Sequence, residues 1–190
     1  VTTSYSDAIV VRDSRRMRDL VDSPWYKERW GDRVRLNRFG ERSFENDRTG
    51  FREGMAFGSL TGARGNRLIL DDPHSTETAE STAERERAVR IFRESVPSRM
   101  VDPVSSAIVI VMQRLHVEDV AGVALALGLG YVHLMLPMEF EADRRCETAI
   151  GFKDPRTYEG ELLFPERFPR EVVDRDKAGM GSFAVAGQFQ

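Results

Sequence analysis

The sequence predicts an α/β protein with a mainly parallel sheet between two layers of helices. Three short apolar segments, 68–70, 106–112 and 131–136, have the character of buried strands, and helical patterns over 76–96 and 117–127 separate them. Strands that alternate with helices are typical of parallel, three-layer α/β sheets. The chain has 190 residues, of which 41% are hydrophobic and 31% charged, so it is long enough to bury the core of one such domain.

The first part of the chain is expected to begin with a helix over 7–22. Capping residues precede it, its apolar residues recur at near-helical spacing, and Ser23 with Pro24 ends it. A second, short helix carries the aromatic residues that follow. Turn residues then separate three expected strands over 33–39, 42–46 and 51–57.

Two acids stand at the end of the first predicted apolar strand. A glycine-spaced loop over 58–65 leads into the strand 68–70, and Asp71 and Asp72 follow directly. Ionised side chains at the end of a buried strand require a partner. One interpretation is a Walker B arrangement, in which the first carboxylate holds Mg²⁺ and the second deprotonates an attacking water. The structural alternative is that Asp72, with Pro73 next to it, serves as a helix cap or turn residue.

Polar residues also follow the second apolar strand. Gln113 and Arg114 come directly after the segment 106–112. Ligands of open parallel sheets bind outside the carboxyl ends of the strands, so the two strand ends together form the candidate site. The usual phosphate-binding partner of a Walker B strand is missing from the sequence. Only three of the 28 basic residues are lysine, and no G-x-x-x-x-G-K-[ST] loop occurs.

The order of these motifs resembles the large terminase subunit of tailed bacteriophages, the motor that pumps DNA into proheads. The resemblance extends from about Ser4 to Gln190 and rests on the order and spacing of several motifs. They are Thr61-Gly62-Ala63-Arg64-Gly65, Leu68-Ile69-Leu70-Asp71-Asp72-Pro73, Ile108-Val109-Ile110-Val111-Met112-Gln113-Arg114-Leu115-His116 with Asp119 and Gly122, and Gly160-Glu161-Leu162-Leu163-Phe164-Pro165.

The resemblance implies a fold and a role for each candidate residue. The fold is that of an additional-strand, RecA-like P-loop NTPase, with ATP and Mg²⁺ as ligands. Asp71 matches the Mg²⁺-holding Walker B acid, and Asp72 falls where the family places its catalytic acid, often Glu. Gln113 and Arg114 match the coupling motif that senses the γ-phosphate. Arg64 is a candidate arginine finger, although an ordinary surface arginine is an equal alternative.

Within the resemblance, residues 1–137 correspond to the C-terminal part of the ATPase domain. Residues 138–190, which are polar and Pro-rich, correspond to a linker toward a nuclease domain. The Walker A portion is expected before Val1 and the nuclease after Gln190, so we expect an exposed sheet edge and no activity from these residues alone.

The resemblance also implies partners and a location. These are double-stranded DNA, the portal protein, the small terminase subunit and further copies of the chain in a ring, without a membrane, in the host cytoplasm and not in the finished virion. Residues 1–70 hold 14 basic and 10 acidic side chains, so this part could face phosphate. The candidates for such a DNA contact are Arg12, Arg15, Arg16 and Arg18, but a solvated helix face is the preferred interpretation.

Two other classes of function stay open. One is a metal-dependent nuclease or phosphohydrolase that uses Asp71, Asp72 and His116. The other is a non-catalytic DNA-binding module, a remnant of a prophage protein. The single Cys146 excludes an internal disulfide and fits a reducing compartment.

Overall fold

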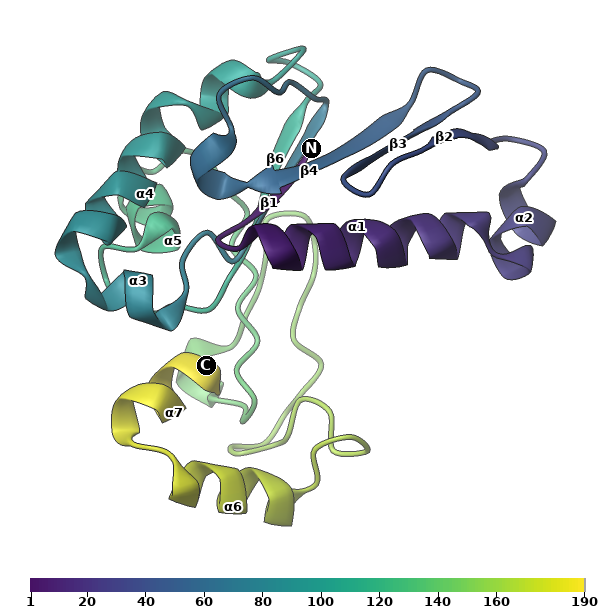
Figure 1. The fold of residues 1–190 in the computed structure, drawn as a ribbon. Coiled ribbons are helices and arrows are strands. Elements are labelled where there is room, and N and C mark those ends of the chain that lie inside the picture. Colours follow the sequence, from purple (N-terminus) through teal and green to yellow (C-terminus); the bar gives the residue numbers. More distant parts are fainter. Residues whose placement is uncertain (190) are drawn as a thin grey trace. The chain divides into compact units, whose positions relative to one another are not determined.

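The computed structural model describes residues 1–189, without the side chain of Phe183, and divides into two compact units (Figure 1). The first unit contains Val1–Met112 and Glu118–Val120. The second contains Gln113–Val117 and the chain from Ala121 onward. Gln190, the last residue of the predicted linker, lies outside the described residues.

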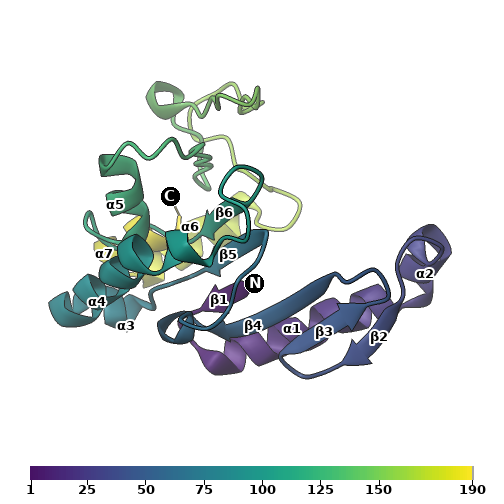
Figure 2. The same cartoon turned by 90° about the horizontal axis from the view of Figure 1, so that it is seen from above.

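The first unit is built on a six-stranded mixed sheet, which confirms the predicted α/β class with a mostly parallel sheet (Figure 2). The strand order is β2-β3-β4-β1-β5-β6. The first three strands in this order pair antiparallel, whereas β4, β1, β5 and β6 are parallel to one another. Their bounds are β1 (Thr2–Ser4), β2 (Leu36–Phe39), β3 (Ser43–Asn46), β4 (Phe51–Ala56), β5 (Arg67–Asp71) and β6 (Ala107–Val111).

The central strand of the sheet is one that the sequence did not predict. β1 has only three residues, Thr2–Ser4, yet it lies between β4 and β5. Its polar side chains are buried, with Thr3 only 2% exposed. Three residues are too few for a hydrophobic period, so the sequence carries no signal for this strand.

The predicted strand over 131–136 is wrong. This segment has no strand geometry, and Val132 and Leu134 are about half exposed. The N–H of Met135 donates to Sγ of Cys146, 3.4 Å away, and not to a strand carbonyl. Because a buried strand needs neighbours for its backbone groups, an apolar run without such neighbours does not form one.

Four helices accompany the sheet. α1 (Asp7–Asp22) and α2 (Pro24–Trp30) confirm the two helices predicted in the first part of the chain. The predicted helix over 76–96 is divided at Ser81 into α3 (Thr76–Glu80) and α4 (Thr82–Glu94). Ser81 is extended, and its carbonyl accepts the first hydrogen bond of α4 from the N–H of Arg85. Short 3₁₀ turns occupy Phe57–Ser59 (η1) and Val96–Arg99 (η2).

Both faces of the central sheet are covered. A Cβ placed on Gly54 of β4 would lie 2.6 Å from Cγ1 of Val10, so α1 packs closely against this face and position 54 requires glycine. Leu68 and Leu70 point to the opposite face and are fully buried. α4 lies on that other side and buries Ala88 and Phe92 (Figure 1).

The strand β6 forms an edge of the sheet, as the sequence predicts. Among the described residues it pairs only with β5. Its sequence is entirely apolar, and Val109 and Val111 are 44% and 54% exposed. Natural edge strands usually carry charges or proline, so an apolar edge indicates a surface suited to a further strand.

The second unit has short helices and no strands among its described residues. Its buried residues include Phe140, Val173 and an ion pair between Arg156 and Asp154, which are 5% and 2% exposed. The guanidinium also donates to the carbonyl of Pro137 at 2.7 Å and lies 5.4 Å from the ring of Phe140. Its helices are α5 (Val120–Ala126), α6 (Arg170–Gly179) and α7 (Ser182–Gln188), and a 3₁₀ turn, η3, occupies Ala142–Arg144. Val120, the first residue of α5, belongs to the first unit.

Removal of the buried Arg156 charge should destabilise the second unit. Arg156→Met leaves the carboxylate of Asp154 buried without its partner, which costs about 3–5 kcal/mol. Exchange of the backbone N–H groups of Phe140 and Leu163 with solvent, measured by NMR, should then accelerate. The exposed Arg175→Met is the matched control and should change nothing. Unchanged exchange in Arg156→Met would show that this ion pair does not hold the unit together.

Candidate functional site

The candidate site lies at the carboxyl ends of the parallel strands β1, β4, β5 and β6. Because these strands run in the same direction, their carboxyl ends meet at one edge of the sheet. Asp71, the last residue of β5, pairs with Val111, the last residue of β6. β5 also pairs with β1, whose chain continues into Tyr5 beside this edge.

The side chain of Asp71 points to the face of the sheet that α1 covers. Thr2 pairs with both Gly54 and Ile69, so these residues share that face, and Asp71 is two residues beyond Ile69. Two charged groups of α1 act on its carboxyl group. The negative Asp13 raises the pKa of Asp71, and the positive Arg12 lowers it.

The Asp71 carboxylate is half-buried and has no hydrogen bond or ion pair with any described residue. Loss of hydration is the largest influence on it and raises its pKa above the ordinary value for aspartate. A partly dehydrated carboxylate without an ion pair or hydrogen bond is unfavourable for the fold. It is also an oxygen donor of the kind that Mg²⁺ prefers, so this residue fits a cation-holding role.

Asp72 has an unusual backbone. Its φ angle is +44°, in the left-handed region that few residues other than glycine occupy. Both of its backbone groups are bonded: its N–H donates to the carbonyl of Val111 at 2.8 Å, and its carbonyl accepts from the N–H of Tyr5 at 2.9 Å. Strained residues of this kind concentrate at functional sites, where the surrounding structure holds them in place.

The interpretation of Asp72 as a helix cap does not apply. The N-cap of α3 is Ser75, whose hydroxyl accepts from the N–H of Thr78, while Thr78 in turn accepts from the N–H of Ser75. This capping box completes the start of the helix without the aspartate. The conformation of Asp72 therefore belongs to the sheet edge and not to the helix that follows.

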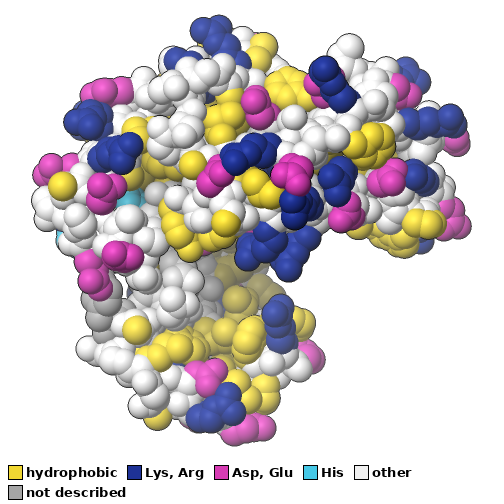
Figure 3. Space-filling model, in the orientation of Figure 1, with side chains coloured by type: hydrophobic (Ala, Val, Ile, Leu, Met, Phe, Trp, Pro, Cys, Tyr) yellow, Lys and Arg dark blue, Asp and Glu magenta, His cyan; other side chains and the backbone are white. Residues whose placement is uncertain are grey.

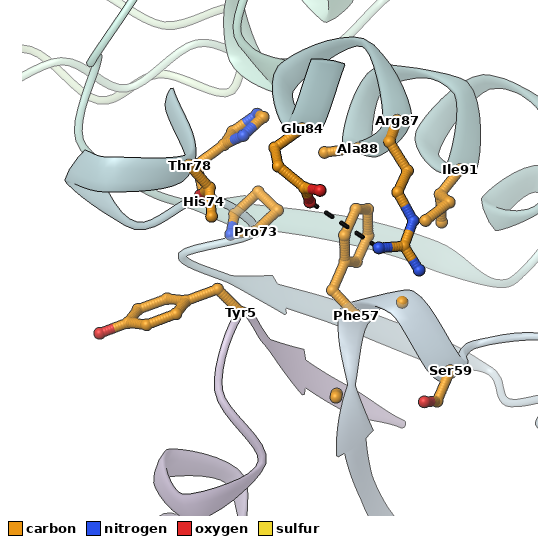
Figure 4. Close-up of a pocket in the computed structure, with 12 residues that line it drawn as sticks. Tyr5, Phe57, Ser59, Pro73, His74, Thr78, Glu84, Arg87, Ala88 and Ile91 are labelled. Carbon is orange, nitrogen blue, oxygen red and sulfur yellow. Dashed lines mark ion pairs between the residues drawn. The ribbon is translucent and has the colours of Figure 1, made fainter. Parts of the chain in front are cut away.

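A pocket of about 310 Å³, which the sequence does not predict, adjoins this edge (Figure 4). Its walls come from the turns after β1, β4 and β5 and from α3 and α4. Glu84 and Arg87 of α4 stand 3.7 Å apart at its rim, and the Phe57 side chain points toward the pocket. His74 could have been noticed beforehand, because it follows the predicted strand end at Asp71 and Asp72, whereas Tyr5 follows β1, for which the sequence carries no signal. The main lining residues are Tyr5, Phe57, Pro73, His74, Arg87 and Ile91.

Gln113 and Arg114 belong to the second unit. The side-chain amide of Gln113 donates to the side-chain oxygen of Gln188 on α7, 3.1 Å away. A Cβ on Gly122 of α5 would lie 2.8 Å from a guanidinium nitrogen of Arg114 and 2.1 Å from the carbonyl oxygen of Val117. A larger side chain at position 122 would therefore clash with the 114–117 segment, so the present position of this segment requires glycine at 122.

Arg64 lies at the other end of β5 from the two acids. It is exposed and precedes the strand, next to Gly65, whose N–H donates to the carbonyl of Arg99. β5 is about 13 Å long, so the structure does not bring Arg64 together with Asp71 and Asp72 of the same chain. An arginine finger acts on the site of a neighbouring subunit, and that role requires no such proximity.

The arginines of α1 are paired with acids of the first unit. Arg12 pairs with Asp13 at 2.8 Å, and Arg18 with Asp19 at 2.9 Å. Arg15 pairs with Glu41, and Arg16 lies 4.0 Å from Asp13. On the face drawn in Figure 3, basic and acidic side chains are interspersed. This arrangement supports the interpretation of a solvated helix face.

No group of three His, Cys, Asp or Glu side chains that could hold a metal ion occurs among residues 1–189. His116 belongs to the second unit, whereas Asp119 is fully buried in the first. In the same part of the chain, no helix is long and apolar enough to cross a membrane.

Comparison with protein-family models and with curated proteins finds no match to this chain.

The carboxylate of Asp71 should make the first unit less stable at neutral pH. The pKa of Asp71 is higher in the folded state than in the unfolded state. The protonated carboxyl group is therefore compatible with the fold at low pH, and the protein loses stability as the pH rises through the folded-state pKa and the group ionises. Asp71→Asn should therefore raise the free energy of unfolding at pH 7, by less than about 1 kcal/mol because the group stays partly in water. The exposed Asp32→Asn is the matched control. Thermal unfolding of both variants checks this, and a less stable Asp71→Asn would contradict it.

Proposed function

We propose that residues 1–190 are part of an ATP-driven motor that translocates double-stranded viral DNA into proheads, as the large terminase subunit does. The observation that carries the proposal is the pair of acids at the end of β5. Asp71 has a half-buried carboxylate without a partner, and Asp72 follows it in a strained backbone conformation. A half-buried carboxylate with a purely structural role, at the position of Asp71, would be expected to form an ion pair or a hydrogen bond.

In this proposal Asp71 holds Mg²⁺. The bound ion supplies positive charge that neutralises the phosphate oxygens of ATP. The protein's contribution is a single carboxylate whose orientation is fixed by the β5–β6 pairing. That this carboxylate forms no ion pair or hydrogen bond with a described residue is what supports this role.

Asp72 is the proposed general base. Its carboxylate orients the attacking water and accepts a proton from it. A base is effective only if its position is fixed, and the hydrogen bonds of Asp72 to Val111 and Tyr5 support this requirement. Aspartate and asparagine tolerate the left-handed conformation better than glutamate does, which gives a reason for Asp where the resembling family often has Glu.

The phosphate-binding half of the site is proposed to come from a segment outside residues 1–190. The apolar, unpaired edge of β6 supports this, because a further strand placed there would cover Val109 and Val111. A parallel strand at this position would bring its own carboxyl end beside Val111, with β6 between it and Asp71. A loop at that end could then supply the backbone N–H groups and the lysine that bind phosphate.

Gln113 and Arg114 are the proposed coupling residues that sense the γ-phosphate, and Arg64 is the proposed arginine finger toward a neighbouring subunit. The full-length protein is then a homo-oligomeric ring that acts with the portal protein and the small terminase subunit. Its location is the host cytoplasm, and it is not a stable component of the virion. The DNA-contacting surface is assigned to no particular residues, because the α1 arginines are neutralised by neighbouring acids.

The alternative of a metal-dependent nuclease or phosphohydrolase requires Asp71, Asp72 and His116 to act together, and His116 belongs to the second unit. No specific observation favours this alternative. The alternative of a non-catalytic DNA-binding remnant gives no reason for the strained Asp72. Retention of strain at this position is better accounted for by catalysis.

The full-length gene product tests the proposal. Asp72→Asn removes the base, while asparagine keeps the tolerance for the left-handed backbone, so folding should be unaffected. ATP hydrolysis, measured as phosphate release, should fall by about 10²-fold or more. Asp71→Asn should lower it through loss of Mg²⁺ binding, and Asp32→Asn is the matched control. Unchanged turnover in Asp72→Asn would exclude this residue as the base.

The 190-residue chain on its own should neither bind ATP tightly nor hydrolyse it, because it has no G-x-x-x-x-G-K-[ST] loop. Isothermal titration with ATP and Mg²⁺ and a phosphate-release measurement check this. Turnover by this chain that Asp72→Asn abolishes would contradict the two-part site. Metal-dependent DNA cleavage without ATP would favour the nuclease instead.

A further inference from the structure

A three-residue segment, Glu118–Val120, ties the later part of the chain to the first unit. It is the only part of the described chain after Met112 that belongs to this unit. The five residues from Gln113 to Val117 therefore form a loop that leaves the first unit at Met112 and returns at Glu118. We call Glu118–Val120 the anchor.

His74 holds the anchor from the loop that follows the two acids. It comes two residues after Asp72 and is only 3% exposed. Its Nε2 accepts a buried hydrogen bond from the backbone N–H of Val120, 3.1 Å away. This bond requires a neutral imidazole with its lone pair on Nε2, so the proton lies on Nδ1. Nδ1 has no partner among the described residues.

The hydrogen bond to Val120 is thus the one polar contact that the described structure gives the buried ring. Placing an imidazole here leaves its second nitrogen unsatisfied, which is unfavourable, and an apolar side chain would avoid that cost. The acceptor at Nε2 is the feature that an apolar side chain lacks. This indicates that the contact with the anchor is the reason for a histidine at position 74.

The rest of the anchor is also held within the first unit. Asp119 is completely buried, and its negative charge acts on His74. Arg85 of α4 is 7% exposed, donates to the carbonyl of Ala79 at 2.7 Å and lies 3.7 Å from the carboxylate of Glu118. Every residue of the anchor therefore interacts with the loop after β5 or with α4.

We propose that His74 is a positioning residue that fixes the anchor to the loop of Asp71 and Asp72 and so keeps the Gln113–Val117 loop closed. Loss of this bond would weaken the attachment of the loop at its Glu118 end, where the contact between Arg85 and Glu118 remains. The role assigned to Gln113 and Arg114 rests on the proposed function. The anchoring itself does not, because it depends only on contacts inside the first unit.

The inference is tested on the 190-residue chain without ATP, so its failure is distinct from a failure of the proposed function. His74→Leu removes the acceptor and His74→Gln keeps one near the position of Nε2. In His74→Leu, amide exchange of Val120 should accelerate by about 10-fold or more, as expected for the loss of a buried hydrogen bond. Tryptic cleavage after Arg114 should also increase relative to cleavage after Arg48, which lies in an exposed turn. His74→Gln should restore most of the protection.

His74→Leu could unfold the first unit, and faster amide hydrogen exchange at Leu68 and Leu70 of β5 would reveal this. A second variant keeps the test decisive in that case. Val120→Pro removes the donor instead of the acceptor, and Val120 is the first residue of α5, where proline is tolerated. It should increase cleavage after Arg114 while β5 stays protected. Where both single variants fold, the double variant should be no worse than either, because they remove the same bond. Equal behaviour of His74→Leu and His74→Gln, unchanged cleavage in Val120→Pro, or additive effects would overturn the inference.

Discussion

The parallel pairing of β1, β5 and β6 is the constraint on which the rest of the candidate site depends. It aligns Asp71 with Val111 and brings the chain after β1 to the same edge. The backbone of Asp72 continues this pairing on both sides, through Val111 and Tyr5, in a conformation that an isolated chain would avoid. The strain at this residue is therefore balanced by the sheet, and the orientation of both carboxylates follows from it.

The same edge explains why neighbouring loops matter for the site. The turn after β5 carries the acids, then His74, and then the capping box that starts α3, all within eight residues. A displacement of this turn would affect the acids and the anchor together. In the proposed function, a change at the acids on phosphate release reaches His74 through two peptide bonds and the anchor through the hydrogen bond from Val120 to His74. The physical basis of this coupling is the hydrogen bond between His74 and Val120 inside the first unit.

Local patterns predicted several elements correctly. α1 and the strands β3 to β6 lie where capping residues, turn residues and apolar runs place them, because these signals act over a few neighbouring residues. Two errors have the same cause. The sequence does not predict β1, because its three residues derive their structure from pairing with β4 and β5. The apolar composition of the segment 131–136 predicts a strand, but the N–H of Met135 donates to Cys146 and not to a neighbouring strand.

The sequence by itself determined the α/β class, the two acids at a strand end and the polar residues after the next strand. These depend on residue type and order along the chain. Only the tertiary structure decided that Asp71 forms no ion pair with a described residue, that Asp72 adopts a left-handed backbone and that Arg64 lies at the opposite end of β5. It also decided that His74 reaches Val120, a contact across 46 positions of the chain. The physical reason is that burial, charge compensation and backbone strain depend on what the neighbouring strands bring close, and no local pattern encodes that.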